Sequence, residues 1–172
     1  MIPKIQKILY ATDRTKNSCH AFLYAIDLAK SHGAKIVVLH VREPIPSYAG
    51  ISFAPPQEEL DKTAKGVRRR INTVCKETEA QVGFPCATMV SKVLVPYGYP
   101  PEEILKATEK ESCDAIVLGT HGKGFLGSVS IAVLHQSQKP VFVVPLPPSK
   151  KAASRPIDQG EEPAPLSSEK FN

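Results

Sequence analysis

The sequence of 172 residues lacks features that mark several classes of protein. It has no tryptophan, and aromatic residues make up only 6% of the chain, so few rings are available for stacking on nucleic-acid bases. The four cysteines Cys19, Cys75, Cys86 and Cys113 form no C-x-x-C pair, which disfavours a zinc site or a redox motif. The N-terminal segment MIPKIQKILYATD has too short an apolar run for a signal peptide or a membrane span. We therefore expect a cytoplasmic protein that has neither a membrane nor a nucleic acid as its partner.

The remaining composition is that of an ordinary globular domain, with 42% hydrophobic and 23% charged residues. Lys and Arg number 22 and Asp and Glu 17, which gives a net charge of +5. This excess suits an anionic ligand but is too small to imply nucleic acid. The run Arg68-Arg69-Arg70 spreads over about 200° of a helix at about 100° per residue, so we interpret it as a solvated face.

The composition changes after Pro145. Residues 147–172 contain five of the 16 prolines, their charges balance, and few apolar residues remain to offset the entropy cost of ordering. We predict a folded domain over residues 1–146 and a disordered, Pro-rich tail over residues 147–172. The tail is either a docking segment or, as we favour, a solvated end.

Five apolar runs alternate with four amphipathic segments in residues 1–146. The runs are rich in β-branched residues and nearly continuous, which is typical of parallel strands covered on both faces. They occupy residues 8–11, 36–41, 89–95, 115–118 and 141–144. Helices are predicted over about 17–30, 56–81, 128–138 and in a segment that opens at Pro100 and Pro101. This order predicts an α/β three-layer sandwich with right-handed crossovers.

Ligands of open parallel sheets bind at the carboxyl ends of the strands, where the strand order reverses. The first run ends at Asp13, whose carboxylate suits two ribose hydroxyls that both donate to it; capping of the first helix or its loop is the alternative. The second run ends at His40 and Val41. We interpret His40 as structural, and Val41 as either an apolar wall for a base or a core residue.

The stretch GTHGKGFLGS, residues 119–128, follows the fourth run and directly precedes a helix. Its glycines allow close approach of the backbone, and the amides and dipole of the helix start suit a phosphate. Lys123 adds positive charge, His121 is a candidate donor to phosphate, and Ser128 is expected to cap the helix. The stretch is not a Walker A loop. The alternative is a flexible turn that binds nothing.

Together these motifs resemble the universal stress protein family over about residues 4–146. The resemblance rests on KILYATD, VVLHV, GYPPEEIL, CDAIVLGTHGKG and GSVSIAVLHQSQKPVFVVP, in that order. It implies a five-stranded parallel sheet with strand order 3-2-1-4-5, an adenine nucleotide alpha hydrolase-like fold, and commonly a homodimer. The last strand would pair across this homodimer through Val141, Phe142, Val143 and Val144. An edge covered by the tail is the alternative.

ATP-binding members of that family carry the motif G-x2-G-x9-G-[ST]. Here four residues rather than nine separate Gly122 from Gly127, so the loop is five residues short. The resemblance places phosphates at Gly122, Gly127 and Ser128, and Asp13 near ribose or adenine; Ala11 stands where relatives often have proline. The expected nucleotide-binding residues are Ala11, Thr12, Asp13, Val41, Gly119, His121, Gly122, Lys123, Gly127, Ser128, Val129 and Ser130.

No pair of groups in the sequence suits general acid–base catalysis. We therefore expect ATP, with or without Mg²⁺, to be a bound ligand of a homodimeric stress-response or signalling module that also contacts an unidentified protein partner. The alternative is a family member that has lost the nucleotide and acts as a dimeric interaction module. A slow ATPase or an autophosphorylating enzyme is the least favoured interpretation.

Overall fold

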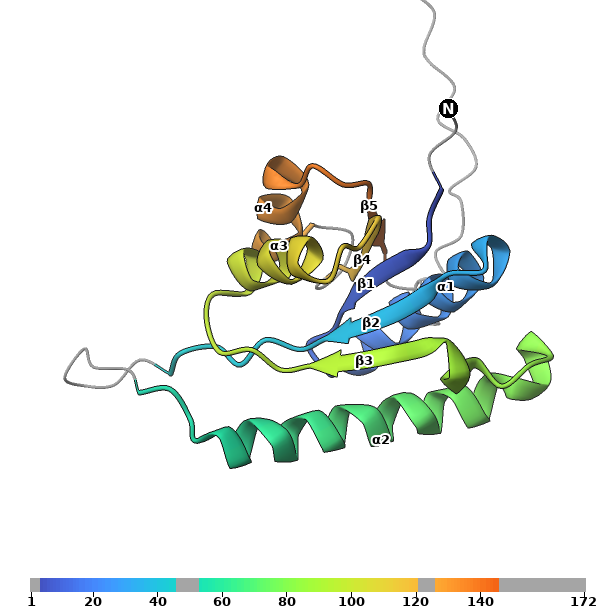
Figure 1. Cartoon of the computed structure of the whole chain (residues 1–172), viewed down its shortest axis with the longest axis horizontal. Coiled ribbons are helices and arrows are strands. Elements are labelled where there is room, and N and C mark those ends of the chain that lie inside the picture. Colours follow the sequence, from blue (N-terminus) through green and yellow to red (C-terminus); the bar gives the residue numbers. More distant parts are fainter. Residues whose placement is uncertain (1–3, 46–52, 121–125, 146–172) are drawn as a thin grey trace, which may run out of the picture.

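The computed structural model of the chain describes residues 4–45, 53–120 and 126–145 (Figure 1). Five parallel strands lie in the order β3-β2-β1-β4-β5, as the sequence predicts. The strands are β1 (Lys7–Ala11), β2 (Lys35–Leu39), β3 (Val90–Leu94), β4 (Ala115–Gly119) and β5 (Val141–Val144). The helices are α1 (Lys16–His32), α2 (Gln57–Val82), α3 (Pro100–Lys110) and α4 (Ser128–Gln136), with the 3-10 helix η1 (Cys86–Met89) before β3.

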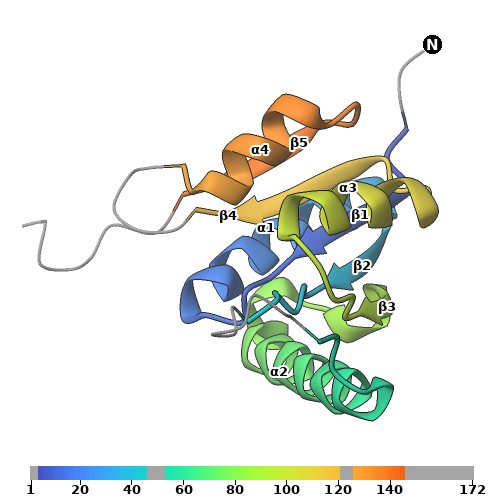
Figure 2. The same ribbon diagram turned by 90° about the vertical axis from the view of Figure 1, so that its left-hand side faces the viewer.

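Helices cover both faces of the sheet, which confirms the three-layer architecture (Figures 1 and 2). Ile8 and Tyr10 of β1 point toward α1 and α2, whereas Leu9, between them, packs with Ile104 of α3 and Val133 of α4. Successive residues of a strand point to opposite faces of the sheet, so each central strand contributes side chains to two separate apolar cores. All three of these β1 side chains are at most 1% exposed.

The side chains of the two edge strands, β3 and β5, are less buried than those of the central strands. Ser91 and Lys92 of β3 are exposed, and Phe142 of β5 is 41% exposed. An edge strand has one neighbour only, so its side chains lose the cover that central strands receive from both sides. Cover on both faces therefore holds for β1, β2 and β4 except at some of their end residues, and it was wrong for β3. The partial exposure of β5 agrees with the sheet edge that is expected for the last strand.

Three of the four cysteines lie in the interior of the protein. Cys75, Cys86 and Cys113 are buried and Cys19 is half-buried, and all four are free thiols. Burial raises the pKa of Cys113 to about 11, so this thiol stays protonated at neutral pH. Among the residues that the structure describes, no helix is both long enough and apolar enough to span a membrane.

Candidate functional site

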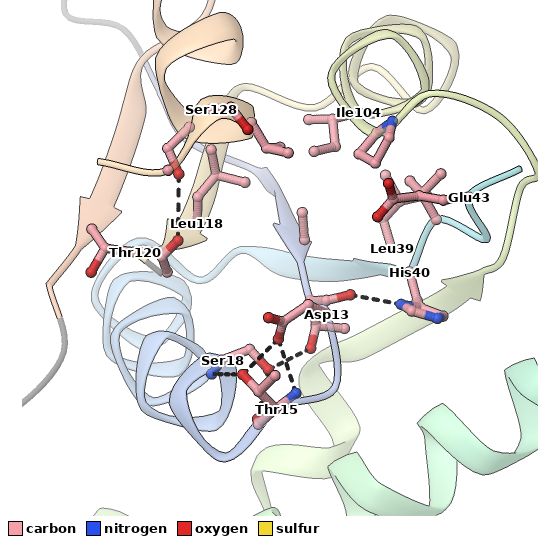
Figure 3. A pocket seen from close by; sticks show the side chains of 18 residues that line it. Asp13, Thr15, Ser18, Leu39, His40, Glu43, Ile104, Leu118, Thr120 and Ser128 are labelled. Carbon is pink, nitrogen blue, oxygen red and sulfur yellow. Dashed lines mark hydrogen bonds between the residues drawn. The ribbon is translucent and has the colours of Figure 1, made fainter. Parts of the chain in front are cut away.

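A pocket of about 420 Å³ opens at the carboxyl ends of β1, β2 and β4 (Figure 3). From β1 the chain adds β2 and then β3 on one side of the sheet. It then returns to the other side of β1 and adds β4 and β5, so the strand order reverses between β1 and β4. This is the place where open α/β sheets bind ligands, and the volume lies in the range of small-molecule sites.

The turn after β1 fixes the position of Asp13 within the pocket wall. The backbone N–H of Thr12 still donates to Leu39 O at 2.9 Å, which holds the turn against β2. Asp13 Oδ1 then accepts from both the backbone N–H and the hydroxyl of Thr15, at 2.9 and 2.7 Å. Thr15 in turn caps α1 by accepting from Ser18 N–H at 3.3 Å. The alternative role of Asp13, capping the loop, is therefore present in the structure, and the carboxylate remains exposed in the pocket.

Buried polar groups support this turn from below. The Tyr10 hydroxyl donates to Ser18 O at 2.6 Å, and the hydroxyls of Thr12 and Ser18 lie 2.8 Å apart. His40 Nδ1 lies 2.9 Å from Thr12 O, and since a carbonyl only accepts, Nδ1 carries the proton. Burial lowers the pKa of His40, so the imidazole is neutral at pH 7. These contacts agree with the structural role predicted for His40.

Arg14, inside the same turn, has a left-handed backbone with φ of +68°. This conformation costs a side-chain-bearing residue about 1 kcal/mol or more. We expect Arg14→Gly and Arg14→Asn to raise the free energy of unfolding by roughly 0.5–1 kcal/mol. Urea titration measures the change, with Arg69→Gly, in the middle of α2, as a control that should lose about 1 kcal/mol. A less stable Arg14→Gly protein would contradict the strain argument.

The opposite wall of the pocket is the start of α4. Gly127 is the N-cap, with φ −67° and ψ 159°, and no side chain caps this helix. The expectation that Ser128 caps α4 was wrong, because Ser128 is already the first helical residue. Helix geometry leaves the first amides of α4 without an intrahelical acceptor, and its first turn has no acidic residue. The wall is thus suited to an anion.

Apolar side chains form the floor between these two walls. Leu39 is the last residue of β2, Leu118 is the last but one residue of β4, and Ile104 approaches from α3. Val41 is half-buried and packs on this cluster, which is the core role that the sequence left open, and it also lines the pocket. An apolar floor with polar ends suits a ligand that has a flat apolar part and polar or charged substituents.

The structure brings most of the predicted site residues to this one pocket. His121, Gly122 and Lys123 lie outside the described residues. The predicted residues that line the pocket are Ala11, Thr12, Asp13, Val41, Gly119, Gly127, Ser128, Val129 and Ser130.

Other residues that line the pocket were not predicted from the sequence. Thr15 and Ser18 were available from the Asp-x-Thr-x-x-Ser spacing, which is typical of a capped helix start. Pro100 and Ile104 line the pocket because α3 packs beside it, and no local sequence pattern indicates this packing. Glu43, two residues beyond Val41, was also missed, and it places a second carboxylate on the wall.

The charges of the described lining are unevenly distributed. It contains the carboxylates of Asp13 and Glu43 and, among the described residues, neither Lys nor Arg. Figure 3 shows Glu43 on the side of the pocket opposite Ser128. The described part of the chain has no cluster of three His, Cys, Asp or Glu side chains that would hold a metal ion.

Comparison with known proteins identifies relatives of the whole domain. The sequence profile of the universal stress protein family matches residues 4–145. The "Universal stress protein in QAH/OAS sulfhydrylase 3'region" of Thermus aquaticus is 35% identical over 140 residues, which cover 81% of this chain and 93% of that protein. The structure of protein MJ0577 of Methanocaldococcus jannaschii has a TM-score of 0.59 at 28% identity, covering 86% of this chain and 100% of that one.

Two further structures of this fold contain nucleotides. One is the universal stress protein from Archaeoglobus fulgidus in complex with dAMP, with a TM-score of 0.53, 16% identity, and coverage of 81% of this chain and 97% of that chain. The other is a universal stress protein in complex with cAMP, with a TM-score of 0.51, 18% identity, and coverage of 83% and 98%. Together with the strand order, the structural likenesses confirm the adenine nucleotide alpha hydrolase-like fold.

Proposed function

Since this chain belongs to the universal stress protein family, we propose that its pocket binds an adenine nucleotide, with ATP as the expected ligand. The observation that carries the proposal is a continuous cavity that joins Asp13 to the start of α4 across an apolar floor. Two universal stress proteins of the same fold hold dAMP and cAMP, which supports the class of ligand.

The pocket's chemistry favours one orientation of the nucleotide. Asp13 accepts hydrogen bonds from ribose hydroxyls, and Val41 provides an apolar surface for adenine. The uncapped start of α4 at Gly127 attracts the phosphates, which the carboxylates of Asp13 and Glu43 repel. Mg²⁺, where it accompanies ATP, would take its ligands chiefly from phosphate oxygens and water.

Isothermal titration calorimetry with adenosine, AMP, ADP and ATP, each with and without Mg²⁺, tests the proposal. We expect all four to bind and GTP to bind more weakly, because the apolar surface and the Asp13 turn are proposed to fit adenosine. Absence of binding heat for every adenine compound, checked by competition against a fluorescent ATP analogue, would instead favour the interaction module without nucleotide.

We propose binding without turnover. Preorganised amides at a helix start bind a ground-state phosphate nearly as well as a transition state, which gives affinity but little rate enhancement. His40, the one histidine in the described lining, is engaged with Thr12 O and neutral. We expect purified protein incubated with ATP and Mg²⁺ to release phosphate no faster than the buffer alone. This module is proposed to act in the cytoplasm.

We also propose that the protein forms a homodimer through β5. Ile116 N–H donates to Pro140 O and Thr120 N–H to Val144 O, both at 2.9 Å, so β5 bonds to β4 through alternate residues. The backbone groups of Val141 and Val143 therefore face the open edge. Beside this edge, Ile131 and Leu134 of α4 are 43% and 44% exposed. An apolar edge of this kind is stabilised by pairing with a second copy.

Val143→Asp tests the dimer. A carboxylate on β5 would have to be buried next to its own copy in the dimer, so we expect the variant to be monomeric by light scattering while the wild type has twice the mass. Ser91→Asp, on the opposite edge strand β3, is the matched control and should remain dimeric. An unchanged mass for Val143→Asp would exclude pairing through β5.

A further inference from the structure

The positive charge of this protein is concentrated on one segment of α2. Residues 62–76 contain six Lys and Arg residues and no Asp or Glu, so they carry +6 of a chain whose net charge is +5. All other residues together therefore have a net charge of −1. The basic character of the protein is local, and it lies on a helix that the nucleotide pocket does not use.

The helix arranges four of these cations in a line. At about 100° per residue, Lys62, Lys65, Arg69 and Lys76 fall within an arc of about 60° and extend over about 21 Å. All four are exposed. The buried residues Val67, Ile71, Val74 and Cys75 occupy the opposite side of the helix. We call the four cations the basic ridge of α2. The interpretation of Arg68 to Arg70 as a solvated face holds for Arg69 and Arg70, which are exposed, whereas Arg68 is half-buried.

Most of the ridge has no internal partner. Lys62 pairs with Glu58 at 2.9 Å, with both side chains more than 70% exposed. Lys65, Arg69 and Lys76 form no ion pair with any residue that the structure describes. Acidic residues end the positive segment on both sides: Asp61 precedes it and Glu77 follows it. The charge along the helix therefore changes from negative to positive and back to negative.

We propose that the basic ridge of α2 binds an acidic segment of a partner protein. A helix of about 15 residues would match its length of about 21 Å, with acidic side chains in the middle and basic ones at both ends. α2 lies on the far side of the molecule from α4 and β5 (Figure 2), so the ridge stays accessible in a dimer paired through β5.

The charge pattern disfavours the other polyanions. A nucleic acid carries negative charge continuously, so its phosphates would meet Asp61 and Glu77 at the two ends of the ridge. α2 also has no aromatic residue to stack on a base. An anionic membrane calls for apolar side chains beside the cations, and no large exposed apolar residue lies on α2.

Fluorescence anisotropy at physiological salt tests the proposal on the full chain. The probe is a labelled, helix-forming 15-residue peptide with central glutamates and terminal lysines. We expect Lys65→Glu, Arg69→Glu and Lys76→Glu together to weaken its binding at least about tenfold. Lys4→Glu, Lys106→Glu and Lys110→Glu together change the net charge equally at other exposed positions and should leave binding nearly unchanged. The corresponding Gln variants at positions 65, 69 and 76 replace the Glu variants if those unfold.

Three results would overturn the proposal: no binding of the peptide to the wild type, an equal loss in the control triple variant, or tighter binding of short duplex DNA or phosphatidylserine vesicles than of the peptide. Glu77→Gln with Glu79→Gln gives an independent check. Neutralising this end of the ridge should weaken the binding of the peptide and strengthen the binding of duplex DNA. An unchanged ratio of the two affinities would also contradict the proposed charge pattern.

Discussion

Asp13→Ala is expected to weaken the binding of adenosine and of ATP by the same factor, roughly 10- to 100-fold. A hydrogen bond to a charged group contributes about 1.5–3 kcal/mol, and about 1.4 kcal/mol corresponds to a tenfold change in affinity. The carboxylate is proposed to accept from ribose hydroxyls, which both ligands contain. Because the phosphates are proposed to bind at α4 instead, the loss should not depend on their number.

Asp13 also orders its own loop, so alanine removes two interactions at once. Its Oδ1 accepts from the backbone N–H and the hydroxyl of Thr15, which caps α1. Asn at position 13 can keep the amide oxygen in this role while it removes the charge and one acceptor. We expect Asp13→Asn to keep the thermal stability of the wild type and to lose most of the affinity for adenosine.

A ligand without the two hydroxyls completes the test. Wild type and Asp13→Asn should bind 2′,3′-dideoxyadenosine with nearly equal affinity, because this ligand has no 2′- or 3′-hydroxyl that could donate a hydrogen bond to residue 13. This cycle isolates the pair of carboxylate and ribose from any effect on the loop. If Asp13→Asn restores full affinity for adenosine, the residue acts only by ordering the loop. If Asp13→Asn loses as much affinity for dideoxyadenosine as for adenosine, the proposed contact between Asp13 and the ribose hydroxyls is wrong.

The fold was largely predictable because its signals are local. Each central strand is a short run of β-branched and apolar residues, and each helix start carries a proline, a glycine or a hydroxyl residue beside it. The strand order itself came from the resemblance, since pairing depends on contacts between distant residues. The incomplete burial of β3 and β5 was not predictable from run composition, because Val141 to Val144 is as apolar as Ile8 to Ala11.

The candidate site was only partly predictable for the same physical reason. Residues at the ends of apolar runs, such as Asp13 and Gly127, were identified because parallel strands bring their carboxyl ends to one edge. Glu43 and Ile104 lie on the same pocket without a motif, since long-range packing of α3 and of the segment after β2 brings them there. The cap of α4 was assigned one residue too late, because Gly127 and Ser128 are both favourable at an N-cap.

Gly127→Val is expected to weaken ATP roughly 10- to 100-fold and to change adenosine by less than about twofold. Gly127 lines the pocket at the start of α4, so an isopropyl group there would occupy the space in which we propose the phosphates approach the amides. The backbone angles of Gly127, φ −67° and ψ 159°, are open to any residue, so the substitution adds no backbone strain. Equal losses for ATP and adenosine in calorimetry would contradict the phosphate assignment.

Gly127→Ser separates this effect from loss of folding. Gly127 has nearly the same backbone angles as Thr15, the N-cap of α1, whose φ is −73° and ψ 165°. A serine at 127 should therefore cap α4 and raise the free energy of unfolding by a few tenths of a kcal/mol. Its hydroxyl would accept from an amide that the phosphate otherwise uses, so ATP should bind more weakly to a more stable protein, with adenosine unchanged. Stability and ATP affinity that rise together would show that the amides of α4 do not receive the phosphate.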